Sequence, residues 1–159
     1  MKVAIIGAGA IAEAHVKAYV RNASTDAVVI ADPNAEARVR LQDAYGIIKQ
    51  AHDAYEPVLE DDDVAIVDVC TPHYLHCRQA IAALEAGKDV IVEKPLAMTV
   101  EEADEMMAAA KRTRRRLFCA LCQRMFPAHQ KAAEIIEAGE IGEPFLGIVN
   151  VIGDEFGRM

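Results

Sequence analysis

Short apolar runs of strand length alternate along the chain with longer stretches in which apolar residues recur at helical spacing. The first run, Val3 to Ile6, is followed by glycines and then by an amphipathic stretch from Ile11 to Val20. This order predicts strand, turn and helix, and it recurs further on. We expect strands at Val3–Ile6, Ala27–Ala31, Val64–Cys70, Asp89–Glu93 and Leu117–Leu121, a weak strand near Ile47–Ile48, and helices at Ile11–Val20, Ala35–Tyr45, Leu75–Ala86 and Val100–Arg112.

The alternation of strands and helices indicates the fold class. Parallel strands need a crossover connection, and that connection is usually a helix. Several strands, such as Ala27–Ala31, are apolar throughout, which suits a sheet that is covered on both faces. We therefore predict an α/β fold with a doubly wound parallel sheet.

The pattern changes after Arg124. Pro127 opens a predicted helix, Ala128–Ala138, and the apolar run Phe145–Ile152 is typical of a strand. We assign residues 1–123 to the α/β domain and residues 124–159 to the beginning of an incomplete second α+β domain. The Phe145–Ile152 segment is expected to expose apolar surface and to favour self-association, so we expect a homo-oligomer.

Composition narrows the function classes. The chain has 159 residues, 53% of them hydrophobic, with 17 Lys and Arg against 25 Asp and Glu, a net charge of −8. This hydrophobic fraction excludes a disordered chain, and the acidic balance disfavours nucleic acid as a partner. No apolar run reaches the roughly 18–20 residues that span a bilayer, and none forms a signal peptide, so we expect no membrane partner and a cytoplasmic location. The four cysteines are then expected to stay reduced.

The sharpest local signal is the glycine-rich turn after the first strand. Gly7 suits the tight turn, Gly9 lets the backbone approach a pyrophosphate, and Ala12 is the small residue that allows close helix packing. The first N–H groups of the following helix, at Ala10 and Ile11, are available to phosphate oxygens. This spacing predicts a dinucleotide site.

Asp32 strengthens that prediction. It stands at the end of the second strand, 20 residues after Ala12 (32 − 12 = 20), where a carboxylate accepts hydrogen bonds from ribose hydroxyls. The same carboxylate would repel a 2′-phosphate, so NAD is favoured over NADP. Arg38 is interpreted as a solvated helix residue rather than a phosphate ligand.

Lys94 follows the Asp89–Glu93 strand at the sheet edge where ligands bind in open α/β folds. It could donate a proton to a substrate oxygen or polarise that oxygen. The alternative is an exposed lysine before a turn, and position alone does not decide between them.

Two further groups resemble metal sites. His73, His76 and Cys77 would share a helix face, but no fourth ligand has suitable spacing, so we expect no metal there. Cys119 and Cys122 have C-x-x-C spacing and are interpreted as two core cysteines, because residues three apart in a strand point to opposite faces.

Five segments together carry a family resemblance: Ala4–Ala12, Val69–His76, Ala83–Val90, Glu93–Leu96 and Gln123–Pro127. They closely resemble the Gfo/Idh/MocA oxidoreductases, the family of glucose-fructose oxidoreductase and inositol dehydrogenase. The resemblance implies a Rossmann domain that holds NAD(P) and an enzyme that transfers a hydride to or from a carbon of a sugar, inositol or related polyol.

The resemblance also assigns roles to residues. Glu93 and Lys94 belong to the Glu-Lys-Pro signature, with Lys94 reaching both the substrate and the nicotinamide ribose as the catalytic residue. Thr71, Pro72, His73 and His76 would line the cofactor's ribose region, and Arg124 would lie near the nicotinamide end.

Two features depart from the family pattern. Members usually run well past 300 residues and use a second domain to complete the substrate pocket, so we expect this chain alone to be inactive. The family often has a glycine near Leu121, where this chain has Ala120-Leu121-Cys122. An alternative function is a regulatory module that senses the cofactor without catalysis; the intact Glu93-Lys94-Pro95 favours the enzyme.

Overall fold

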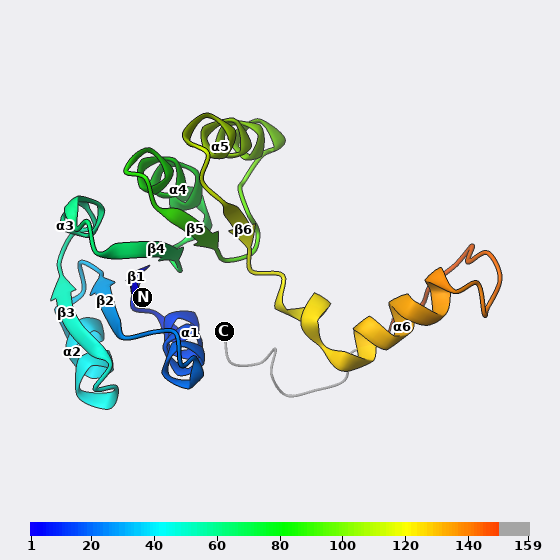
Figure 1. Cartoon of the computed structure of the whole chain (residues 1–159), viewed down its shortest axis with the longest axis horizontal. Helices are drawn as coiled ribbons and strands as arrows, with labels where there is room; N and C mark the ends of the chain where they lie inside the picture. The colour runs from blue at the N-terminus through cyan, green and yellow to red at the C-terminus, as the bar shows by residue number, and fades with distance from the viewer. Residues whose placement is uncertain (150–159) are drawn as a thin grey trace. The chain divides into compact units, whose positions relative to one another are not determined.

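The computed structural model describes residues 1–149 of the chain. These residues belong to two units, one of Met1–Ala120 and one that begins at Leu121 (Figure 1). The division of the chain into domains at residues 123 and 124 stays a prediction.

The first unit alternates strands and helices as the sequence predicts. Its strands are β1 (Lys2–Ile6), β2 (Ala27–Ala31), β3 (Ile48–His52), β4 (Val64–Val69), β5 (Asp89–Val92) and β6 (Leu117–Cys119). Its helices are α1 (Ala10–Arg21), α2 (Ala35–Ala44), α3 (Glu56–Glu60), α4 (His76–Glu85) and α5 (Val100–Thr113), with a 3₁₀ turn, η1, at His73–Leu75.

All neighbouring strands pair in parallel, in the order β3-β2-β1-β4-β5-β6. The chain first builds outward from β1 to β3 and then returns to add β4 on the other side of β1 (Figure 1). This reversal makes the carboxyl ends of β1 and β4 the switch point, where open α/β sheets bind ligands. The predicted doubly wound parallel sheet is confirmed.

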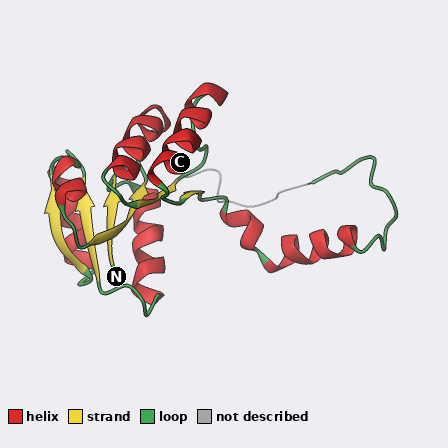
Figure 2. Ribbon diagram, turned by 45° about the horizontal axis from the view of Figure 1, so that its top comes forward, coloured by secondary structure: helices red, strands yellow, loops and turns green. Residues whose placement is uncertain are grey.

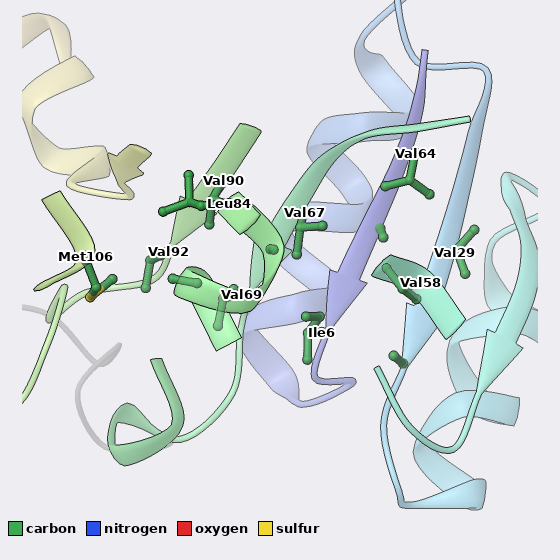
Figure 3. Packing of buried hydrophobic residues seen from close by; sticks show 14 of the residues in the cluster. Ile6, Val29, Val58, Val64, Val67, Val69, Leu84, Val90, Val92 and Met106 are labelled. Atoms are coloured by element: carbon green, nitrogen blue, oxygen red, sulfur yellow. The ribbon is translucent and has the colours of Figure 1, made fainter. Parts of the chain in front are cut away.

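Helices cover both faces of this sheet (Figure 2). Because successive side chains of a strand point to opposite faces, β1 sends Ala4 and Ile6 to one face and Ile5 to the other. The cluster on the first face also includes Leu84 of α4 and Met106 of α5 (Figure 3). On the second face the partners include Val16 of α1 and Leu41 of α2. Each fully buried aliphatic side chain of this size contributes about 1.5–3 kcal/mol, so both layers stabilise the sheet edge that carries the site.

Local capping residues fix the helix ends. The side chain of Asn34 accepts the Ala37 N–H at the start of α2, and the Thr99 hydroxyl accepts the Glu102 N–H at the start of α5. The Glu102 carboxylate reaches back to the Met98 N–H, one residue earlier than a capping box predicts. These contacts satisfy N–H groups that the first helical turn leaves free.

Three elements differ from the sequence prediction. The predicted strand Leu117–Leu121 is shorter, since β6 ends at Cys119. β3 continues to His52, beyond the predicted Ile47–Ile48. It is an edge strand, and its exposed polar residues Lys49 and Gln50 interrupt the apolar pattern from which its length would be predicted. The short helix α3 was not predicted; a single turn that buries only Val58 leaves little periodicity to detect.

The second unit contains a 3₁₀ turn, η2 (Cys122–Met125), and the helix α6 (Pro127–Glu137). The predicted strand at Phe145–Ile152 is wrong for residues 145–149, which form no strand, and residues 150–152 lie outside the described part. A strand needs a hydrogen-bonded neighbour, and none pairs with residues 145–149 among the described residues. Phe145, Leu146, Ile148 and Val149 are exposed, as expected.

The C-x-x-C pair is also placed differently from the prediction. Cys119 is half-buried at the end of β6, whereas Cys122 is exposed in the second unit. The interpretation of both as core cysteines is therefore wrong, because β6 ends at Cys119 and the chain enters η2 before Cys122.

No helix within residues 1–149 has the length and apolar character needed to cross a lipid bilayer.

Candidate functional site

The glycine-rich turn lies at the switch point between β1 and β4. Gly7 has φ +101°, and a Cβ there would lie 2.7 Å from the carbonyl oxygen of Cys70. Only glycine tolerates both conditions. The turn therefore brings the backbone of Gly7 against Cys70, directly after β4.

Gly9 differs from Gly7, since a Cβ there would meet nothing within 4 Å. Gly9 is the N-cap of α1, and no side chain caps the helix. The N–H groups at the start of α1, including those of Ala10 and Ile11, are thus left without a capping side chain. Open space beside an uncapped helix N-terminus fits a phosphate group.

Asp32 holds the glycine-rich turn from the neighbouring strand. Its Oδ2 accepts the Ala8 N–H and its Oδ1 accepts the Asn34 N–H, each at 2.7 Å. Each carboxylate oxygen retains capacity for a second hydrogen bond. Asp32 also lines the cavity described next, so this capacity faces a ligand space.

A cavity of about 450 Å³ follows the carboxyl edge of the sheet beside the switch point. It runs from the ends of β2 and β3 to the loop after β4. Its lining comprises Ile6, Gly7, Gly9, Ala31, Asp32, Pro33, Asp53, Ala54, Tyr55, Cys70, Thr71, Pro72, Tyr74, Leu75, Arg78 and Gln79. Four of the predicted cofactor residues other than Asp32 are among these: Gly7, Gly9, Thr71 and Pro72.

Two arginines that could have met a phosphate are engaged with the backbone instead. Arg38 donates to the Asp32 carbonyl oxygen at 2.5 Å, and Arg40 donates to the Ala8 carbonyl oxygen at 2.9 Å. Arg38 thereby braces the loop after β2, and Arg40 braces the glycine-rich turn after β1.

His76 and His73 do not line the cavity. His76 is buried, and its two ring nitrogens lie 2.9 Å from the carbonyl oxygens of Thr71 and Pro95. His73 is exposed and packs edge-on to His76, with ring centroids 5.6 Å apart. His76 therefore links the loop after β4 to the loop that carries Lys94.

The metal alternative for this group fails on geometry. The Cys77 thiol points to the Glu102 carbonyl oxygen at 3.7 Å, whereas His76 has both nitrogens engaged by carbonyl oxygens. These two side chains do not converge on a common point.

Glu93 and Lys94 point in different directions at the end of β5. Glu93 is buried, with 7% of its surface exposed, whereas Lys94 is exposed. The Lys94 N–H donates to Glu93 Oε2 at 2.9 Å, and the following Lys94–Pro95 peptide bond is cis. The Lys94 ammonium is thus accessible, while the Glu93 carboxylate turns inward.

The inward carboxylate belongs to a polar cluster that the sequence analysis missed. His15 of α1 lies between Asp68 of β4, at 2.7 Å, and Glu93, at 3.0 Å. Tyr19 donates its hydroxyl to Asp68 at 2.7 Å, and the Cys70 thiol faces the same carboxylate at 3.7 Å. The sequence does contain an indication of this cluster. His15 and Tyr19 lie on the same helix face as the buried residues Ala12 and Val16, where apolar residues are expected.

The cluster perturbs its titratable groups. The hydrogen bond to Asp68 is the main cause that raises the pKa of His15 to about 8, against the opposing effect of burial. Burial, supported by the Asp68 charge, raises the pKa values of Tyr19 and Cys70 well above their usual ranges. Tyr19 and Cys70 therefore remain neutral hydrogen-bond donors at physiological pH.

Arg124 lies in the second unit, in η2. Its assignment to the nicotinamide end stays a prediction.

A comparison with known protein families agrees with the dinucleotide site at the glycine-rich turn. The family described as "Oxidoreductase family, NAD-binding Rossmann fold" matches residues 1–121. The chain belongs to the Gfo/Idh/MocA oxidoreductases. Its first unit is an NAD-binding Rossmann domain of that family, and the resemblance found in the sequence is confirmed.

Three relatives illustrate the family. Levoglucosan dehydrogenase of Pseudarthrobacter phenanthrenivorans is 36% identical over 150 residues, covering 89% of this chain and 38% of that protein. D-xylose 1-dehydrogenase (NADP(+)) of Hypocrea jecorina is 33% identical, covering 95% of this chain and 41% of the relative. Scyllo-inositol 2-dehydrogenase (NAD(+)) of Bacillus subtilis is 33% identical, with coverage of 91% and 42%.

A solved structure gives the same result. Levoglucosan dehydrogenase in complex with NADH matches with a TM-score of 0.80 at 35% identity, covering 89% of this chain and 40% of that one. This chain spans about two fifths of the length of the curated relatives that it matches.

Proposed function

We propose that this chain is the NAD-binding portion of an oxidoreductase that transfers a hydride between nicotinamide and an alcohol carbon of a sugar, inositol or related polyol. The observation that carries the proposal is the Asp32–Ala8 hydrogen bond, which joins the ribose-binding acid to the phosphate-binding turn at the edge of the cavity. The printed names of the relatives support the substrate class.

The cofactor contacts are assigned from the open groups of the site. The backbone of Gly7 and Gly9 and the N–H groups of Ala10 and Ile11 receive the pyrophosphate, because this helix start is uncapped. Asp32 accepts ribose hydroxyls with the acceptor capacity that Ala8 and Asn34 leave free.

NAD is the proposed cofactor rather than NADP. The 2′-phosphate of NADP would lie beside the Asp32 carboxylate, and two neighbouring negative charges repel each other. Arg38 and Arg40 each donate an N–H to a backbone carbonyl oxygen, and neither lines the cavity, so neither is assigned to a 2′-phosphate.

Lys94 is the proposed catalytic residue. When bound, the nicotinamide supplies or accepts the hydride. The Lys94 ammonium donates a proton to the carbonyl oxygen during reduction, and the neutral amine accepts the hydroxyl proton during oxidation. Exposure of Lys94 at the carboxyl end of β5 leaves its amine able to reach a substrate.

Other assignments remain part of the proposal. By the family resemblance, we propose that Thr71 and Pro72 flank the cofactor and that His73, His76, Glu93 and Arg124 lie around it. The exposed apolar residues between Phe145 and Val149 support a homo-oligomer. The net charge of −8 argues against nucleic acid. A cytoplasmic location stays a prediction.

Affinity labelling tests the position of Lys94. Periodate converts the ribose diols of NAD to dialdehydes, which condense with a nearby lysine amine and are trapped by borohydride. We expect the adduct on the peptide that contains Lys94, and we expect excess NADH to suppress it.

Lys94→Met should abolish the adduct, whereas Lys111→Met, on the exposed side of α5, should leave it unchanged. Labelling that spares Lys94, or that NADH does not suppress, would contradict the assignment.

A further inference from the structure

His15 occupies a junction between three elements of the first unit. It lies in the second turn of α1, and its side chain is only 17% exposed. Nδ1 lies 2.7 Å from Asp68 of β4, and Nε2 lies 3.0 Å from Glu93 at the end of β5. Both carboxylates are themselves buried, at 0% and 10% exposed.

The contacts continue from Glu93 to the catalytic loop. Glu93 uses Oε1 for His15 and Oε2 for the backbone N–H of Lys94, at 2.9 Å. At the other end, His15 follows the N-terminus of α1 by five residues, or about 7.5 Å along the helix. One helix thus carries the proposed phosphate site at its start and holds the Lys94 loop from its side.

We propose that His15 is a positioning residue, which acts through Glu93 to hold the backbone of Lys94 in place relative to the phosphate-binding start of α1. The proposal deepens the proposed function and rests on it, since Lys94 is the residue that is positioned. His15 is not among the residues that line the cavity; one lining residue, Cys70, has its thiol 3.6 Å from His15 Nδ1.

The double contact requires a protonated imidazole. Ionised carboxylates only accept hydrogen bonds, and a neutral imidazole has a single N–H to donate. Loss of the ring proton would turn a lone pair toward either Asp68 or Glu93. The link from α1 to Lys94 is therefore complete only while His15 is charged.

The surroundings of His15 determine where it titrates. The groups that face it are Asp68 from β4, Glu93 from the end of β5 and the Cys70 thiol, 3.6 Å from Nδ1. On its own helix, Tyr19 donates to Asp68. The carboxyl groups of Asp68 and Glu93 favour the charged imidazole ring, whereas Cys70 and Tyr19 carry no charge that opposes it. The pKa of His15 is therefore raised to about 8. The Lys94 loop is thus held firmly below pH 8 and loosens above it.

Nuclear magnetic resonance on the 159-residue chain without cofactor tests this. The probes are the ring resonances of His15 and the backbone amide of Lys94, whose hydrogen bond to Glu93 makes it sensitive to that carboxylate. We expect both to shift with pH through one inflection near 8. A Lys94 amide that stays constant while the His15 ring titrates would overturn the proposal, as would a His15 ring that does not titrate near that pH.

Two variants distinguish a role of His15 in positioning Lys94 from a general role in stabilising the fold. His15→Gln should displace the Lys94 amide at neutral pH and remove its inflection. Tyr19→Phe removes another hydrogen bond to Asp68 but leaves Glu93 untouched, so its Lys94 amide should keep the inflection. Loss of the inflection in Tyr19→Phe as well would contradict a specific route through Glu93.

The wild-type titration alone decides the proposal if a variant fails to fold. Because no cofactor is present, a negative result here leaves the labelling of Lys94 by oxidised NAD unaffected. A failure of that labelling would likewise remove the proposed function without changing the titration.

Discussion

Gly7 lies so close to Cys70 that a Cβ on Gly7 would come within 2.7 Å of the Cys70 carbonyl oxygen. The same turn is fixed on both sides, since the Gly7 N–H donates to the Ala31 carbonyl and the Cys70 N–H donates to the Ile6 carbonyl, each at 2.7 Å. The requirement for glycine at this position thus comes from the protein itself. At Gly9 the space is open, so the requirement there would come from the ligand.

We predict that Gly7→Ala destabilises the fold. The added Cβ meets backbone that cannot move without disturbing β4, and φ +101° is strained for alanine. The cost should be roughly 1–3 kcal/mol in the free energy of unfolding, measured by urea denaturation. Stability equal to that of wild type would show that the turn adapts.

Gly9→Ala, in contrast, should weaken cofactor binding more than it destabilises the fold. The Cβ meets nothing in the protein, so stability should fall by no more than about 1 kcal/mol, the effect of alanine at an N-cap position. The methyl group would occupy the space assigned to the pyrophosphate, and NADH affinity should fall at least about tenfold, or ~1.4 kcal/mol. Gly46→Ala, also in open space, is the matched control and should change neither quantity. Unchanged NADH binding by Gly9→Ala would contradict the phosphate assignment.

Stability should depend on pH through His15. Its folded pKa, about 8, exceeds its ordinary value of 6.5. The stabilisation is therefore complete below about pH 6.5 and is lost as pH rises through 8. The shift corresponds to about 2 kcal/mol. Urea denaturation of wild type and His15→Gln should show a stability difference that shrinks by about that amount between pH 6 and pH 9. A difference that is constant over this range would contradict the imidazolium assignment.

Much of the fold and the turn could be predicted from sequence because the signals are local. Ala27–Ala31 is apolar throughout and is followed at once by Asp32, and Gly7 and Gly9 directly follow β1. The same local reasoning failed where a partner decides the structure. Residues 145–149 have an apolar pattern, but without a paired neighbour among the described residues they form no strand.

The His15 cluster could not be predicted in this way. His15 lies 53 residues from Asp68 and 78 residues from Glu93. Their contact depends on β4 and β5 following β1 in the sheet, an order that no single segment encodes. The sequence indicates the cluster only through two polar residues at positions where apolar residues are expected. These are His15 on the buried face of a helix and Asp68 in an apolar strand.

The chain alone should bind cofactor but turn over polyols negligibly. Positioning of a substrate supplies about 7–11 kcal/mol of a barrier reduction, and it needs a pocket that encloses the reacting groups. Lys94 is exposed rather than enclosed. Absorbance of reduced nicotinamide should therefore stay constant with a panel of sugars and inositols. Rapid turnover by the monomeric 159-residue chain, with its size checked by light scattering, would show that the pocket is already complete.

Calorimetric titration of the chain with NADH and with NADPH tests the central claim, that Asp32 and the glycine-rich turn form an NAD site. We predict micromolar-range binding of NADH and binding of NADPH that is at least about tenfold weaker. Asp32→Ala should narrow this preference, because it removes both a ribose acceptor and the charge that repels a 2′-phosphate. Asp63→Asn, a charge loss at an exposed loop, should leave the preference unchanged. Tighter binding of NADPH than of NADH by the wild-type chain, or binding of neither, would contradict the account.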